Sequence, residues 1–146
     1  MIAGLVVCVA VLAAATVFGV AWRRREGRLR AITDGTRPGV LTSAQLAHPL
    51  GPRATLVQFS TAFYAPCRAT RRILAEVAAT VEGVTHVEID AESPLDLVRS
   101  LAILATPTVF VLDRDGTIVR RATGQPRKAD VIAALGAIGS APRAMT

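Results

Sequence analysis

The chain has 146 residues, enough for one compact domain and a short additional segment. It is 51% hydrophobic and 4% aromatic, which excludes a disordered or collagen-like chain, and its two cysteines are too few for a disulfide-stapled miniprotein. The formal net charge of +6 points to a polyanion partner until the charges are located along the chain.

Most of the excess positive charge lies in one short stretch. Residues 1–22 carry no charged side chain, whereas residues 23–52 carry six arginines against two acidic side chains, a net charge of +4. Residues 53–146 carry 11 basic and 9 acidic side chains, a net charge of only +2. A nucleic-acid surface would spread basic charge over the folded domain, with aromatic residues for stacking, so no nucleic-acid partner is expected.

Residues 1–22 form an apolar run that ends at Trp22 and has the length needed to cross a bilayer, roughly 20 residues. We therefore predict one transmembrane helix, followed at once by three arginines. A cleaved signal peptide is the alternative, but it would carry its positive charge before the apolar run. Because basic flanks stay in the cytoplasm, we expect a single-pass protein of the cell membrane with its domain on the cytoplasmic side. Cys8 is interpreted as a small apolar membrane residue.

Residues 23–39 are predicted to form a basic juxtamembrane linker that contains the turn signals Asp34-Gly35 and Pro38-Gly39. A short edge strand is expected at residues 40–41. Ser43 has the chemistry to cap a short helix that runs through Leu46.

Strands and helices alternate from residue 54 onward. Strands are predicted at residues 54–60, 85–90, 108–112 and 117–122, with the last two joined as a hairpin. Helices are predicted from Pro66 to Gly83, from a Ser93 cap to about Leu104, and from Pro126 onward with one apolar face formed by Val131, Ile132, Leu135 and Ile138. The order indicates an α/β domain over residues 40–140, with parallel strands joined by helical crossovers, then a tail at 141–146.

Three motifs then occur in the order and spacing of the thioredoxin family, which the chain resembles. Residues 59–68, Phe-Ser-Thr-Ala-Phe-Tyr-Ala-Pro-Cys-Arg, resemble the family's strand, loop and Trp-Cys-Gly-Pro-Cys-Lys helix start. Residues 105–109 resemble its segment with a cis-proline, and Gly124 stands where the family keeps a glycine. The resemblance implies a thioredoxin fold, a central mixed sheet flanked by helices, preceded here by the transmembrane helix. It also implies a thiol–disulfide oxidoreductase that acts on protein or peptide thiols and disulfides and needs no cofactor.

The departures from the family pattern fall on the chemistry. Tyr64 occupies the position of the nucleophilic cysteine, and Cys67, after Pro66, occupies the resolving position. Gln58 stands where thioredoxins usually keep a buried aspartate that moves protons. Dithiol exchange needs an attacking thiolate, and a phenol forms no sulfur–sulfur bond, so efficient disulfide reduction is not expected. By the resemblance, Phe63, Thr106 and Pro107 would contact an extended peptide substrate. For Pro107 the alternative is a rigid turn that shapes the loop.

Three interpretations of Cys67 stay open: a buried structural thiol, residual one-thiol chemistry, and metal ligation. His48 and His86 show no ligand spacing to it, so no metal site is predicted, and His86 is expected to be half-buried and hydrogen-bonded. The predicted function is a membrane-anchored thioredoxin-like protein of thiol–disulfide redox homeostasis with a degenerate active site. The alternative is a non-catalytic module that binds peptides or acts as a scaffold.

Overall fold

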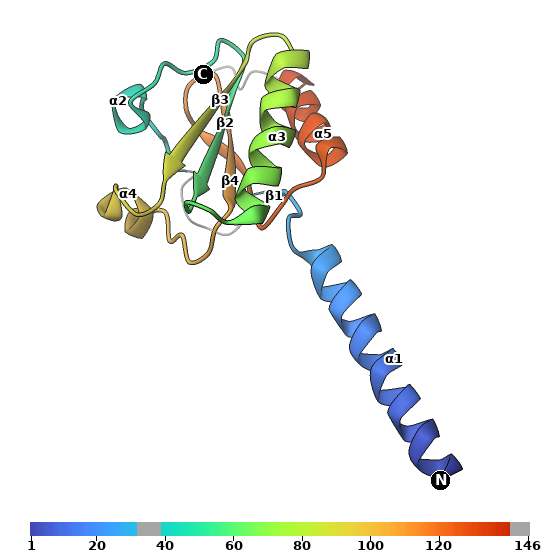
Figure 1. Cartoon of the computed structure of the whole chain (residues 1–146). Coiled ribbons are helices and arrows are strands. Elements are labelled where there is room, and N and C mark those ends of the chain that lie inside the picture. The colour runs from blue at the N-terminus through green and yellow to red at the C-terminus, as the bar shows by residue number, and fades with distance from the viewer. Residues whose placement is uncertain (32–38, 141–146) are drawn as a thin grey trace.

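The computed structural model describes residues 1–31 and 39–140. The turn signals at Asp34-Gly35 and Pro38, and the predicted tail at 141–146, lie outside the described residues. Figure 1 shows the elements of the described part in chain order: α1 (Ile2–Arg25), β1 (Arg30–Ala31), α2 (Ser43–Leu46), β2 (Ala54–Ser60), α3 (Ala65–Thr80), β3 (Val84–Asp90), α4 (Leu95–Ser100), β4 (Thr108–Asp113), β5 (Ile118–Thr123) and α5 (Lys128–Ser140).

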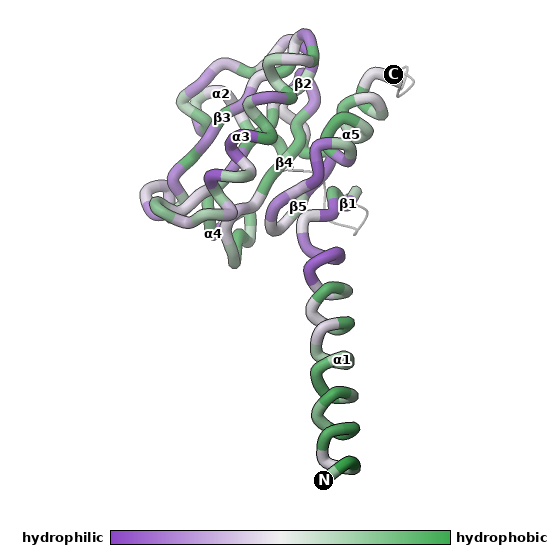
Figure 2. Tube along the Cα trace, turned by 45° about the vertical axis from the view of Figure 1, so that its right-hand side comes forward, coloured by the Kyte–Doolittle hydropathy of each residue, from purple (hydrophilic) through white to green (hydrophobic). Residues whose placement is uncertain are grey.

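Helix α1 projects away from the rest of the chain (Figure 1), and none of its 24 residues is buried. Figure 2 shows hydrophobic residues along most of its length and hydrophilic residues where it meets the domain, at Arg23–Arg25. The helix is long and apolar enough to cross a membrane. A signal sequence at the N-terminus passes the same test, so α1 is a candidate membrane span.

A mixed five-stranded sheet forms the centre of the domain, with strand order β1-β5-β4-β2-β3. Strands β2 and β3 are parallel and β4 pairs with β5 as an antiparallel hairpin, both as predicted. However, β4 runs antiparallel to β2, which corrects the expectation that the helix after β3 returns the chain to a third parallel strand. Helix length explains the difference. The 16 residues of α3 span about 24 Å and return the chain along a whole strand, whereas the six residues of α4 span only about 9 Å. The chain therefore starts β4 near the end of the sheet where β3 finished.

Both faces of the sheet are buried. Along β2, and likewise along β4, successive side chains point to opposite faces. On one face, Leu56 and Val109 pack with Leu74 and Val77 of α3 and Val131 of α5. On the other face, the core consists of apolar side chains from the sheet and from the segments around α2 and α4: Leu41, Leu46, Val57, Phe59, Val87, Ile103, Phe110, Leu112 and Ile118. The site residues at the end of β2 are thus held by a strand with no exposed positions.

Several predicted boundaries need correction. The cap of α2 is Thr42, whose side chain pairs reciprocally with Gln45 in a capping box, and not Ser43. Helix α4 ends at Ser100 because Ala102 adopts a left-handed conformation, with φ of 49°, that closes the helix. The predicted Ser93 cap also does not form, since no side chain caps α4.

The ends of the predicted domain also differ in detail. Strand β1 lies inside the predicted linker and pairs with β5, with Arg30 opposite Arg121. The edge strand expected at residues 40–41 is a single bridge between Val40 and Thr117. In α5 the buried positions follow the spacing of Val131, Ala134 and Leu135, which leaves Ile132 on the solvent side at 42% exposure.

Candidate functional site

The candidate site lies where β2 ends and α3 begins. Phe63 has φ of 62° and is 96% exposed, so the loop between the two elements turns sharply and presents the aromatic ring to solvent. Tyr64 is the N-cap residue of α3 and makes no side-chain capping hydrogen bond. Its carbonyl accepts hydrogen bonds from the backbone N–H groups of Cys67 and Arg68, at 3.1 and 3.2 Å. Pro66 lies in the first helical turn, where its missing N–H costs nothing.

The two positions that correspond to the family's cysteine pair differ strongly in access to solvent. Tyr64 is 49% exposed, whereas Cys67 is 2% exposed and lies on the buried side of α3. Cys67 is a free thiol, and the other free thiol, Cys8, belongs to α1. The exposed member of the pair therefore carries a phenol, and the member that carries sulfur is shielded.

Gln58 lies beneath the start of α3 as a fully buried polar residue. Its Nε2 donates to the carbonyl oxygen of Cys67 at 2.8 Å and to Oγ of Ser60 at 2.7 Å. Its Oε1 accepts from Nε2 of His86 at 3.2 Å. A buried amide with all these partners satisfied fixes the first turn of α3 to the sheet without titrating. His86 belongs to this network, although it was not among the site residues predicted from the sequence.

The charges next to this network belong to Arg71 and Glu88, which form a two-point ion pair between α3 and β3. Burial lowers the pKa of His86, and the nearby Glu88 carboxylate only partly opposes that effect. Partial burial alone would raise the pKa of Glu88, but hydrogen bonds from Arg71 and Ser60 outweigh it and hold the pKa below its usual value. The same surroundings thus favour the neutral form of His86 and the ionised form of Glu88.

The second loop of the candidate site contains the cis peptide bond between Thr106 and Pro107. The hydroxyl oxygens Oγ1 of Thr106 and of Thr61 are in hydrogen-bond contact, which joins this loop to the one that precedes α3. Pro107 is buried, and its carbonyl accepts from the N–H of Gly124 at 2.8 Å. Gly124 has φ of 91°, a conformation that favours glycine.

Among the site residues expected from the sequence, the structure thus brings Gln58 to Cys67 and places the Thr106 loop against the loop that carries Phe63 and Tyr64. Arg68 supports the latter loop, because its Nη1 donates to the carbonyl of Phe63 at 2.9 Å. In the part of the chain that the structure describes, no three histidine, cysteine or acidic side chains gather in a group that could hold a metal ion. What the arrangement offers chemically is one shielded thiol and an exposed aromatic loop.

Comparisons with known proteins agree with this geometry. The sequence model of the thioredoxin family matches residues 42–137. Chloroplastic thioredoxin z is 26% identical, with a TM-score of 0.56 over 62% of this chain and 81% of its own. Thioredoxin f from spinach chloroplast in its short form is 22% identical, with a TM-score of 0.54 over 62% and 80% of the two chains. Mitochondrial thioredoxin 3 from Saccharomyces cerevisiae is 16% identical, with a TM-score of 0.51 over 58% and 78%. No curated protein matches the chain.

Proposed function

Since the chain belongs to the thioredoxin family, we propose that it is a membrane-anchored thioredoxin-like protein of thiol–disulfide redox homeostasis whose dithiol centre is degenerate. The observation that carries this proposal is the pairing of an exposed Tyr64 at the helix N-cap with a buried Cys67 one turn further along. Reduction of a disulfide needs an accessible thiolate for the first attack and a second thiol to release the product. This site supplies only the second, so its turnover of protein disulfides is at background level.

The helix N-terminus remains suited to a reactive thiol. The backbone N–H groups of the first turn and the helix dipole would lower the pKa of a thiol at position 64. Pro66, Cys67 and the cis-proline loop are all present around that position. A single substitution should therefore restore dithiol chemistry.

The test is insulin reduction by the full chain and its variants. The wild type is expected near background, and Tyr64→Cys is expected to form an internal disulfide on mild oxidation and to gain reductase activity. Adding Gln58→Asp should raise the rate further, by about 10-fold, because a carboxylate beneath α3 can exchange a proton with Cys67. Tyr64→Ser is the matched control, since it removes the phenol without adding sulfur, and it should stay at background. Rapid insulin reduction by the wild type would contradict the degenerate centre.

A second candidate function, a non-catalytic peptide-binding or scaffold module, is favoured by a separate observation. Phe63 is 96% exposed and Leu104 is 95% exposed, and they lie on the two loops that Thr61 and Thr106 join. Exposed large apolar side chains on adjoining loops are typical of contact surfaces for partners. If Tyr64→Cys folds but neither forms the disulfide nor reduces insulin, this module replaces the oxidoreductase. Peptide binding that is insensitive to reductant and lost in Phe63→Ser would then support it.

The anchor and its orientation belong to the same proposal. Helix α1 would hold the protein in the cell membrane, with the domain on the cytoplasmic side. Two features support this: α1 carries no buried residue, and Arg23–Arg25 form its last turn while no charged side chain precedes them. Basic residues that flank a membrane span favour the cytoplasmic side.

A further inference from the structure

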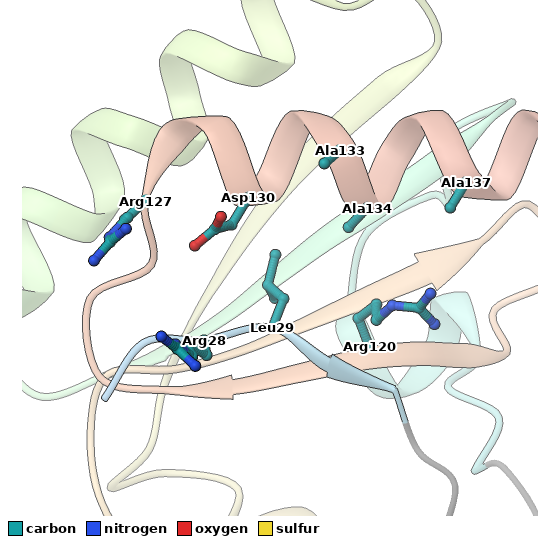
Figure 3. A pocket seen from close by; sticks show the side chains of 8 residues that line it. All are labelled: Arg28, Leu29, Arg120, Arg127, Asp130, Ala133, Ala134 and Ala137. Atoms are coloured by element: carbon teal, nitrogen blue, oxygen red, sulfur yellow. The ribbon is translucent and has the colours of Figure 1, made fainter. Parts of the chain in front are cut away.

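A pocket of about 450 Å³ lies between α5, the segment just before β1, and β5, and none of the residues that line it belongs to the candidate site. Figure 3 shows side chains that reach into this space from the segment before β1, from β5 and from the start of α5: Arg28, Leu29, Arg120, Arg127 and Asp130. The remaining wall consists of small side chains of α5, which leave the space open: Ala133, Ala134 and Ala137.

The pocket carries excess positive charge. Three arginines against one aspartate give a net charge of +2. Within residues 1–31 and 39–140 none of these arginines forms an ion pair, because the ion pairs there belong to Arg71, Arg114 and Lys128. Nη1 of Arg120 donates to the carbonyl oxygen of Val119 at 2.9 Å. In the part of the chain that the structure describes, the other guanidinium donors of these arginines make no hydrogen bond, which leaves them for a ligand. The planar fork of arginine matches the oxygens of a phosphate group.

The pocket also lies beside the end of the apolar helix. Arg28 follows the last residue of α1 by three positions. The N–H of Gly27 donates to the carbonyl of Thr123 at 2.6 Å, so the exit from α1 is tied directly to β5. A Cβ on Gly27 would lie 1.9 Å from the carbonyl oxygen of Gln125, two residues before Arg127. This close packing places Arg28 and Arg127 together at the junction.

From charge, shape and position together, we infer that the pocket binds the phosphate of an anionic phospholipid headgroup, with Arg28 and Arg127 at one end and Arg120 at the other (Figure 3). A phosphate is the chemistry that a lipid headgroup and a soluble phosphate ester share. The lipid is the source that the position favours, because α1 would bring the pocket to the level of the headgroups. The inference rests on the proposed anchoring of α1. A lipid bound in the pocket would hold the domain in one orientation on the membrane.

The experiment titrates the full chain in neutral detergent micelles with phosphatidylglycerol and with phosphatidylcholine, and counts bound lipid by native mass spectrometry. We expect one phosphatidylglycerol to bind saturably and phosphatidylcholine to bind much more weakly. The triple variant Arg28→Gln, Arg120→Gln, Arg127→Gln should weaken phosphatidylglycerol binding by about 100-fold, the product of three arginine contacts near a membrane surface. The matched control Arg23→Gln, Arg24→Gln, Arg25→Gln removes the same charge and should weaken binding far less, because these three side chains do not line the pocket.

Three results would overturn the inference. Equal affinity for the two lipids would show that the headgroup charge is not recognised. An effect of the control as large as that of the pocket variant would reduce the binding to diffuse juxtamembrane charge. Binding of glycerol 3-phosphate or inorganic phosphate as tight as that of phosphatidylglycerol would make a soluble phosphate the ligand. Failure of the anchoring is distinguishable from all three, because the mature protein would then lack residues 1–22 and would be recovered outside the membrane fraction.

Discussion

Cys67 is 2% exposed, and the carbonyl of the same residue is held by Gln58 beneath the helix. A reagent can reach its sulfur only when the start of α3 opens or the chain unfolds. In the native state the thiol therefore behaves as a small apolar core group, despite its position near a helix N-terminus. The helix terminus would lower the pKa of a thiol at position 64, but Tyr64 occupies that position and carries no sulfur.

This burial leads to a labelling prediction. In a Cys8→Ser background, which leaves Cys67 as the only thiol, a maleimide should label the folded full chain about 100-fold more slowly than the urea-unfolded chain, since labelling then requires local opening. Mass spectrometry after timed quenching measures both rates. Equal rates would show an accessible thiol and would revive the one-thiol chemistry that the sequence left open.

His86 gives a prediction about pH. Burial lowers its pKa in the folded state below the unfolded value of about 6.5, so the unfolded chain binds the extra proton more readily. Its contribution to stability is therefore present above pH 6.5 and is lost as the pH falls below that value. We expect the melting temperature of the full chain to fall between pH 7.5 and pH 5, and to fall less in His86→Gln, which keeps a donor for Gln58 but does not titrate.

The charged groups next to His86 do not contribute to the pH dependence measured in this test. The groups that act on His86 are Glu88 and Arg71. The pKa of Glu88 is itself lowered, so its contribution is lost only at more acidic pH than the range measured. A melting temperature with the same dependence on pH in both proteins would contradict the assignment.

The candidate site shows what a sequence can predict at the scale of residues. Gln58, Tyr64 and Cys67 lie within ten positions of one another, so one strand and one helix start were enough to place them together. His86 lies on the neighbouring strand, 28 residues after Gln58. It reaches Gln58 only because the register pairs Leu56 with His86, and no local pattern specifies that register.

At the scale of elements, how closely the predicted bounds match the observed ones depends on how much of the element is buried. Strand β2 was predicted over residues 54–60 and forms over Ala54–Ser60, because all seven of its side chains are buried and read as a continuous β-rich run. Strand β1 has two residues, both exposed, and exists only through its pairing with β5. A segment that depends on a partner strand carries no periodic signal of its own.

The junction between α1 and β1 gives a prediction at this scale. Gly27 has φ of 76°, and a Cβ there would meet the backbone of Gln125 at 1.9 Å. Gly27→Ala should therefore destabilise the domain by about 1–3 kcal/mol and weaken the pairing of β1 with β5. Thermal unfolding and hydrogen exchange at residues 118–123 measure the two effects.

The matched control for this substitution is Gly136→Ala in α5, where a Cβ would meet nothing within 4 Å. There the same chemical change should leave stability unaltered or raise it by up to about 1 kcal/mol, because alanine is the better helix former. Equal effects of the two substitutions would show that the junction is not closely packed in solution.

At the scale of the whole molecule, charge is distributed unevenly about one apolar helix. Residues 1–22 have no charged side chain, and the six arginines of residues 23–52 follow them. The domain beyond is nearly balanced, with 11 basic and 9 acidic side chains over residues 53–146. The same stretch thus supplies both the orientation signal and Arg28 of the phosphate pocket.

This asymmetry predicts the side of the membrane on which the domain lies. A positive flank resists translocation, and the arginines lie within the last turn of α1 and the residues just after it, where this effect is strongest. A C-terminal alkaline phosphatase fusion should therefore be inactive and a C-terminal green fluorescent fusion bright in the membrane fraction. Changing Arg23, Arg24 and Arg25 to Asn should shift both reporters toward the outside, since it removes half of the six arginines. An active phosphatase with a dark fluorescent fusion would reverse the orientation, and a mature protein that lacks residues 1–22 would identify α1 as a cleaved signal peptide.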